Sequence, residues 1–278
     1  MYFISARRFF WYSSDLSETD EIHLVEPAKL KSHSVDMAQL QAAASGRRVL
    51  VLIHGYNNNT VATLLAYRQA RVGIDAHAAV YGATYDLVVG YIWPGEWVLT
   101  EFPAAVATAE GLAGRMRQIL IALGATAASV DVCAHSLGNL VVLGALALGG
   151  VHVRNVFALA PALEHDALDP PGKLYAASTQ CEQLHILHSR HDYVLRHGYQ
   201  YYKGTPALGL DGPPLPDRTA AAVFVVDSGG LVTGLGAGTK HDQYRRIGQT
   251  YELMARAAVS RPQTKRFRLE ALDTAGWA

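Results

Sequence analysis

The chain has 278 residues, of which 50% are apolar and 17% are charged, against a usual charged share of about 25%. A sequence this apolar can bury a large core, which excludes intrinsic disorder as its main state. Its 24 Lys and Arg residues balance 24 Asp and Glu residues. No general field therefore exists to attract nucleic acid or an anionic membrane surface.

The cysteines and the apolar segments bear on the compartment. Cys133 and Cys181 lie near apolar runs and provide no disulfide framework. The first ten residues lack the apolar run of a signal peptide, and the longest apolar segment, residues 137–151, is too short to span a bilayer. We therefore expect a cytoplasmic protein without stable membrane insertion. The sequence does not indicate an oligomeric state.

In chain order, the predicted elements alternate between strands and helices. Residues 1–46 carry a weak pattern and are expected to add one or two edge strands. Six β-branched runs then follow that are apolar throughout, which is typical of strands covered on both faces of a parallel sheet. They span residues 48–54, 87–93, 129–135, 153–159, 184–188 and 222–227. Helix-length segments lie at residues 60–72, 103–123, 137–148 and 241–259.

This alternation predicts an α/β fold with a mostly parallel central sheet and helices on both faces. We expect one domain over residues 1–278. Residues 195–220 are rich in Tyr, Gly and Pro and are expected to form a small, loop-rich, lid-like insertion. The insertion is equally compatible with an aromatic pocket wall and with a surface excursion.

The strongest chemical signal lies where the strand at 129–135 meets the next helix. Ala134–His135–Ser136–Leu137–Gly138 nearly matches the turn on which a nucleophilic serine sits. Because this turn crowds the backbone, the residues two before and two after the serine must be small. Gly138 satisfies this requirement fully and Ala134 approximately. The turn would expose the Ser136 hydroxyl and aim the Leu137 amide at a developing oxyanion. The alternative is an ordinary connection with a capping serine.

A second loop upstream would complete an oxyanion hole. The strand at 48–54 runs into His54–Gly55–Tyr56–Asn57, where Gly55 permits close approach of the backbone. The amide of Tyr56 is the predicted second donor, and His54, Gly55 and Asn57 are expected to border the substrate. An Asn-rich turn that caps the following helix is the simpler alternative, and both can hold together.

These two loops, with Trp93–Pro94 at the end of the next strand and Asn139 after the serine turn, resemble the α/β-hydrolase superfamily. More narrowly, they resemble a bacterial branch of it whose function is largely unknown. The resemblance covers residues 48–259. It implies the α/β-hydrolase fold, a Ser–Asp–His triad in that chain order and no cofactor. It implies no particular substrate.

The other two members of a triad are sought after the serine, since the hydroxyl needs a base and the base needs an orienting carboxylate. Asp192 follows the strand at 184–188 and is the preferred acid, with Asp166 and Asp227 as rivals. His241 is the only histidine after Asp227 and follows a Gly-rich loop at residues 229–238. It is the predicted base, and a helix cap is the alternative.

Three further residues are assigned to the substrate pocket: His135, Trp93 and Tyr193. The side chain of His135 should nevertheless point away from the attacking oxygen, which favours a structural role. Histidines at 185, 188 and 191 would suggest a metal site on a helix, but the segment is predicted as a strand, where this spacing alternates faces. We therefore expect no metal.

Together these residues predict a serine hydrolase, most readily a carboxylesterase that acts on a small-molecule acyl ester. Amidase, thioesterase and acyltransferase activities use the same triad and stay open. A non-catalytic binding protein on the same fold is the alternative from another class, since fold does not fix function.

Overall fold

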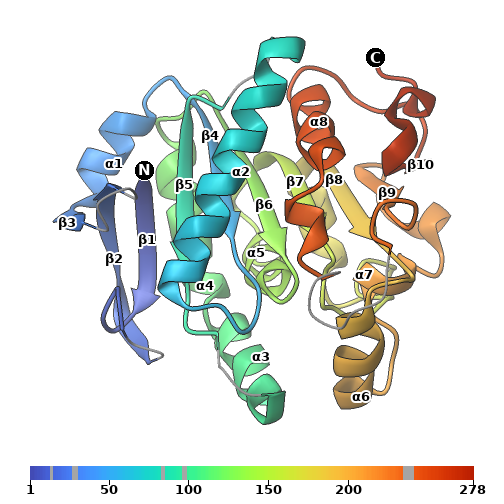
Figure 1. Ribbon diagram of the computed structural model, residues 1–278, viewed down its shortest axis with the longest axis horizontal. Helices are drawn as coiled ribbons and strands as arrows, with labels where there is room; N and C mark the ends of the chain where they lie inside the picture. The colour runs from blue at the N-terminus through green and yellow to red at the C-terminus, as the bar shows by residue number, and fades with distance from the viewer. Residues whose placement is uncertain (13–14, 27–30, 83–84, 96–98, 234–240) are drawn as a thin grey trace.

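The computed structural model describes residues 1–12, 15–26, 31–82, 85–95, 99–233 and 241–278. Within them, ten strands form one sheet in the order β10-β9-β8-β7-β6-β4-β5-β1-β2-β3 (Figure 1). The strands are β1 (Tyr2–Arg7), β2 (Leu16–Glu26), β3 (Lys31–Val35), β4 (Arg48–Ile53), β5 (Leu87–Ile92), β6 (Ser129–His135), β7 (Val153–Leu159), β8 (Cys181–His188), β9 (Val223–Asp227) and β10 (Arg266–Arg268).

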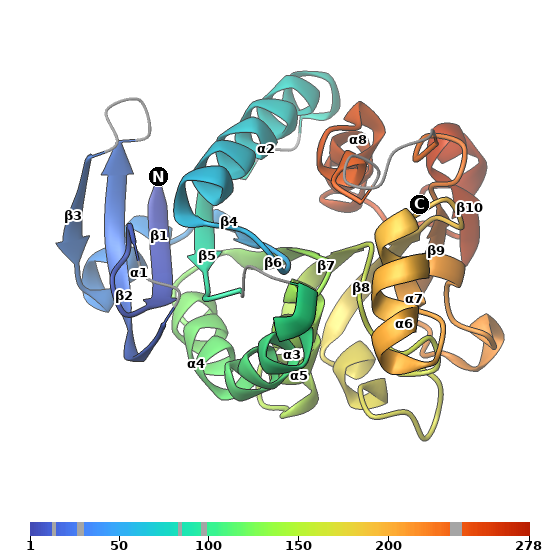
Figure 2. The ribbon, with the colours of Figure 1, turned by 60° about the horizontal axis from the view of Figure 1, so that its bottom comes forward.

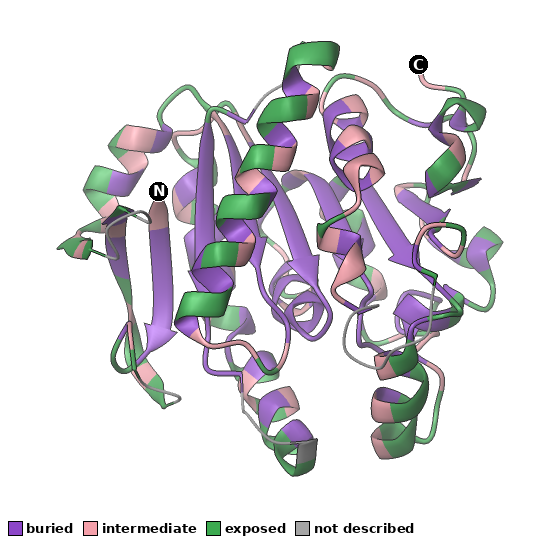
Figure 3. Cartoon of the chain, in the orientation of Figure 1, coloured by how far each residue is buried: buried purple, intermediate pink, exposed green. Residues whose placement is uncertain are grey.

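The sheet is parallel except at one edge, where β2 runs antiparallel to both β1 and β3. Every residue of β5 is buried, and so is every residue of β6 after Ser129. Figure 3 shows these central strands buried along their length. The continuously apolar runs in the sequence therefore reflect strands covered on both faces, and the predicted mostly parallel α/β fold is confirmed.

Helices cover both faces of the sheet (Figure 2). α2 (Thr60–Tyr81) packs beside α8 (Gly248–Ala257) on one face. α4 (Ala113–Gly124) and α5 (Gly138–Ala147) lie on the other, and α1 (Met37–Ala44) packs against α4. The remaining helices are α3 (Phe102–Gly111), α6 (Gln200–Lys203) and α7 (Leu208–Asp211). None of the helices described is both long and apolar enough to cross a membrane.

The N-terminal region and the helix bounds differ from the sequence prediction. Residues 1–46 form three strands and a helix rather than one or two edge strands. β2 and β3 are buried only in part, as is usual at an exposed antiparallel edge, so they lack continuously apolar runs, whereas β1 is buried from Phe3 to Arg7. The Asn59 side chain caps α2, which extends to Tyr81 and ends at left-handed Gly82.

Three further expectations need correction. The segment 103–123 is two helices, α3 and α4, that meet at Leu112 between Gly111 and Gly114. The last helix begins at Gly248, because residues 243–245 form a short 3-10 turn instead. The insertion at 195–220 is mostly short helical turns, including α6 and α7, rather than loop.

His185 occupies an unusual place in the middle of β8. Its ring is fully buried and stacks between Phe157 and Phe224, with centroid distances of 5.2 and 5.3 Å. Neither ring nitrogen has a hydrogen-bond partner within the described residues. Burial lowers the pKa of His185 to about 3. The ring is therefore neutral in the folded protein, and its polar atoms lose their hydration without compensation.

Replacing His185 with Leu should stabilise the protein by on the order of 1 kcal/mol, since it removes an unsatisfied buried polar group of similar size. The unfolded imidazole titrates near pH 6.5 and the folded one near 3. Wild type therefore loses stability as the pH falls below about 6.5, by up to ~1.4 kcal/mol per pH unit from this group. Urea unfolding at pH 7.5 and 5 should show a smaller loss for H185L, and an equal loss contradicts this explanation.

Candidate active site

The turn after β6 has the strained backbone geometry of a nucleophile turn, although Ser136 itself is only 6% exposed. Ser136 adopts a φ of 54°, in the left-handed region that residues with a side chain avoid. Its backbone N–H donates to Leu159 O at 2.9 Å. The Asn139 amide donates to Ser136 O at 2.9 Å and to Ala134 O at 3.2 Å. These bonds hold the serine in a strained conformation at the carboxyl end of a central strand.

Two glycines make the turn possible. A Cβ on Gly138 would lie 2.4 Å from His54 O, and a Cβ on Gly55 would lie 2.6 Å from Ser136 Cβ. Both distances are far inside van der Waals contact, and the obstacle to Gly138 is backbone that cannot swing away. The predicted small residue after the serine is therefore required because the upstream loop presses on the turn.

Replacing Gly138 with Ala should disrupt the turn, whereas Gly114→Ala should not. A Cβ on Gly114, which lies in α4, meets nothing within 4 Å. G114A should leave the melting temperature unchanged or slightly higher, because Ala favours helix by about 1 kcal/mol over Gly. G138A should lower it by several degrees and reduce labelling of Ser136 by a serine-directed fluorophosphonate. Normal melting and labelling of G138A contradict the assigned close approach.

The structure joins Asp192 to His241. Asp192 lies in the turn after β8 and is fully buried, and His241 is 9% exposed. His241 Nδ1 donates to Asp192 Oδ2 at 2.8 Å, and the Leu195 amide donates to Asp192 Oδ1 at 3.1 Å. Because the carboxylate accepts from Nδ1, Nε2 of a neutral His241 carries the lone pair. This is the tautomer that a general base needs.

His135 connects this pair to the serine turn. Its Nε2 donates to the backbone carbonyl of His241 at 2.7 Å, and the two rings lie 4.6 Å apart. Burial strongly lowers the pKa of His135, so its ring is neutral. Since a carbonyl only accepts, the proton must sit on Nε2. His135 is 3% exposed and hydrogen-bonds the His241 backbone next to Ser136. It borders a cavity of about 20 Å³ together with residues of α2 and α8, and it does not line the cavity beside the serine turn.

The rival carboxylates lie elsewhere. Asp166 is exposed on the loop after β7. Asp227, at the end of β9, is also exposed and accepts from the Gly229 amide at 2.8 Å. Within the described parts of the chain, the carboxylate that is hydrogen-bonded to His241 is that of Asp192. Part of the Gly-rich loop expected before His241, residues 234–238, lies outside the described residues.

The upstream loop differs from the prediction in one respect. His54 and Trp93 are both fully buried and were wrongly assigned to the substrate pocket. The Trp93 amide donates to His54 Nε2 at 3.1 Å, its indole donates to His54 O at 2.8 Å, and the two rings stack. Burial lowers the pKa of His54 to about 3 and keeps it neutral. This pair supports the loop from beneath.

The rest of the loop connects to the insertion through aromatic rings. Tyr56 packs edge-on against Phe102 at the start of α3, and Phe102 in turn contacts Tyr199 and Tyr202. The insertion therefore reaches toward the loop after β4 by way of α3. Asn57 is exposed at a φ of 58°, and Gly55 is buried against Ser136.

Tyr193 follows Asp192 directly. It is 45% exposed and packs on the ring of His197, with the two centroids 4.2 Å apart. The Tyr193 side chain is therefore partly exposed to solvent. Tyr193 lines neither the cavity beside the serine turn nor four other cavities found among the described residues.

A small cavity of about 50 Å³ lies beside the serine turn. Its apolar wall includes Leu137 and Leu140 after the serine, and Leu163 and Leu174 from the loop after β7. Ala162, also in the wall, donates its amide to Ser136 O at 3.3 Å. Charged side chains of Glu110, Glu164, Lys173 and Lys203 surround it, with a Lys173–Glu110 ion pair at 2.7 Å.

Sequence reasoning missed Asn139 as the clamp on the turn, His135 as the link to His241, and most of the cavity wall. Tyr199 and Lys203 of the wall lie in the insertion, for which a pocket wall was one of the two interpretations. Asn139 gave a signal, because it is a polar residue in an otherwise apolar helix. The cavity gave none, since its wall comes from separate segments. In the parts of the chain that the structure describes, no group of three His, Cys, Asp or Glu residues could hold a metal ion.

Residues 31–211 match the family described as alpha/beta hydrolase of unknown function (DUF900). The chain belongs to this family. Among solved structures, it is similar to a lipase-esterase related protein from Clostridium acetobutylicum ATCC 824, with 15% identity and a TM-score of 0.28. That similarity covers 66% of this chain and 74% of the other. No protein of curated function matches the sequence.

Proposed function

We propose that the protein is a serine carboxylesterase that hydrolyses esters of short acyl groups. The bond between His241 Nδ1 and Asp192 Oδ2 is the observation that carries the proposal. A buried carboxylate that orients a histidine is the acid–base half of a catalytic triad. His135 ties this histidine to the strained turn that carries Ser136.

In the proposed mechanism, His241 Nε2 takes the proton from Ser136 Oγ as the oxygen attacks the ester carbonyl. Asp192 stabilises the resulting imidazolium, and the amides of Leu137 and Tyr56 hold the oxyanion. His241 then gives the proton to the leaving alcohol, and an acyl-serine remains. Water, deprotonated by His241, attacks this ester and releases the carboxylic acid with Ser136 restored.

The cavity beside the turn favours a short acyl group. A cavity needs about 10–15 Å³ of accessible volume to hold one water-sized group. The cavity of about 50 Å³ therefore admits roughly three to five such groups. Leu137, Leu140 and Leu174 give it an apolar lining, which suits the hydrocarbon part of an acyl chain.

Ser136→Ala should lower the turnover of p-nitrophenyl butyrate by roughly 10⁴-fold or more. The variant should also lose fluorophosphonate labelling, while Ser45→Ala, an exposed serine after α1, should keep both. Asp192→Asn should still bind ester but turn it over far more slowly, because Asn cannot stabilise the imidazolium. A folded wild type that neither labels nor hydrolyses any ester favours the non-catalytic binding protein instead.

Leu174→Ala should shift the preferred acyl chain toward longer esters, since it enlarges the apolar cavity that Leu174 lines. The measurement is kcat/KM for p-nitrophenyl esters from acetate to decanoate. Wild type should peak at two to four carbons, and L174A at a longer chain. Leu65→Ala, at a 59% exposed position on α2, is the control and should leave the profile unchanged. A flat profile in wild type contradicts the assignment of this cavity.

A further inference from the structure

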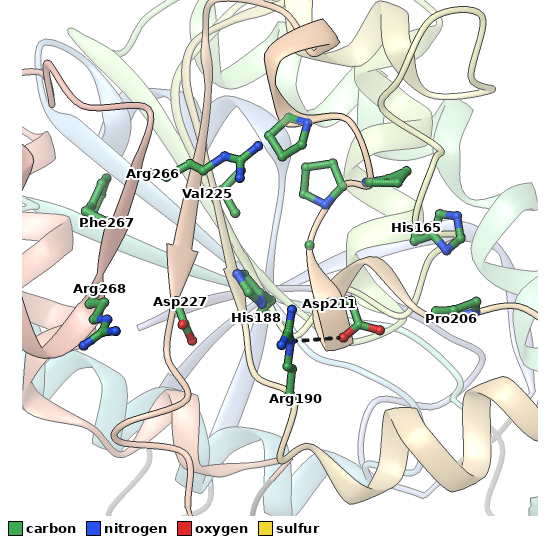
Figure 4. Close-up of a pocket in the computed structure, with 14 residues that line it drawn as sticks. His165, His188, Arg190, Pro206, Asp211, Val225, Asp227, Arg266, Phe267 and Arg268 are labelled. Atoms are coloured by element: carbon green, nitrogen blue, oxygen red, sulfur yellow. Dashed lines mark ion pairs between the residues drawn. The ribbon is translucent and has the colours of Figure 1, made fainter.

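A second, larger cleft of about 660 Å³ opens at the carboxyl ends of β8, β9 and β10, under the segment 206–216 (Figure 4). Its volume lies in the range of small-molecule sites. In parallel sheets, ligands commonly bind at the carboxyl ends of strands. None of the residues proposed for ester hydrolysis lines this cleft.

The strand register places a row of polar side chains on the floor of the cleft. His188 pairs with Asp227 across β8 and β9, and Asp227 pairs with Arg268 across β9 and β10. Two residues earlier along both strands, Val225 pairs with Arg266. Partners in parallel strands project from the same face of the sheet. Arg266 and Arg268 therefore present two guanidinium groups to one side.

The charges of the cleft are unevenly satisfied. Asp211 has an ion pair with Arg190 at 3.6 Å, and Asp227 accepts from the Gly229 amide. For Arg266 and Arg268, in contrast, the described residues supply no carboxylate within 4 Å and no hydrogen-bond acceptor. Both carboxylates thus have partners, whereas Arg266 and Arg268, two residues apart on β10, have none among the described residues. The cleft is left with cationic groups that an anion would satisfy.

Two further features indicate a prepared site. His188 lines the cleft at 9% exposure, and its buried Nδ1 has no hydrogen-bond partner in the described chain. Burial lowers its pKa and keeps the ring neutral. The opposite wall contains Pro206, Pro213, Pro214 and Pro216, whose fixed φ angles restrict its motion. A wall of this kind loses little entropy when a ligand binds.

We propose that this cleft binds a small phosphate-bearing molecule, with Arg266 and Arg268 as the phosphate ligands. Guanidinium groups match the oxygens of phosphate with paired N–H donors, and a dianion balances two of them. Arg190 lies at the mouth of the cleft, where its 77% exposed side chain can join the anion. Asp211 and Asp227 offer acceptors for hydroxyl groups on the rest of the molecule.

The test is isothermal titration of the full-length protein with inorganic phosphate and with glycerol 1-phosphate at constant ionic strength. Wild type should bind one equivalent of each, and glycerol 1-phosphate should bind more tightly. Arg266→Ala/Arg268→Ala should weaken binding at least tenfold. The control Arg47→Ala/Arg68→Ala removes the same charge from exposed positions elsewhere and should stay within twofold of wild type.

Several outcomes overturn the proposal: no saturable binding by wild type, equal loss in both double variants, or succinate binding as tightly as phosphate. If the β10 double variant does not fold, Arg190→Gln, an exposed position, should weaken binding several-fold. Ser136→Ala should bind phosphate like wild type, so this result stands apart from the outcome for ester hydrolysis.

Discussion

The site is organised by the contact between the turns that leave β4 and β6. These strands are neighbours in the sheet, with Ile53 paired to Ala134, so their following turns share one small space. Gly138 fits under His54 O, and Gly55 fits against Ser136, only because neither carries a side chain. The strained φ of Ser136 is held by this packing and by Asn139. Without the contact, the serine would relax and the upstream loop would lose its place beside it.

The other two residues of the proposed triad, His241 and Asp192, come from distant parts of the chain and are connected to the serine turn through hydrogen bonds. His241 lies 106 residues after His135 in the chain, yet its carbonyl accepts the His135 Nε2–H. Its side chain reaches the other way, to Asp192 after β8. The histidine is thus fixed at two points, through its backbone and through its ring.

The sequence predicted those parts of the structure that depend on local pattern or on chain order. Strands buried on both faces are continuously apolar, so β6 and β7 were placed with their observed bounds. Asp192 and His241 follow from the order of strands after the serine. His54 and Trp93 were placed wrongly, because polar groups that satisfy each other inside a core look the same in sequence as groups that face a ligand. The cavity wall and the N-terminal strands depend on tertiary packing, which no local pattern records.

The position of β8 explains how the proposed esterase site and the proposed phosphate cleft can lie so close in the chain. His188 ends the strand with its side chain on the floor of the cationic cleft, and four residues later Asp192 is buried against His241. The turn between them separates the side chain of His188, which lines the cleft, from that of Asp192, which contacts His241. Within this turn, the Ser189 hydroxyl accepts a hydrogen bond from the His191 amide. Because all the parallel strands end at one edge of the sheet, any strand beyond the triad adds polar residues to that same edge. β9 and β10 therefore lie beyond the serine turn, whose hydrogen bonds come from β6, from the start of α5, and from β7 and the loop after it.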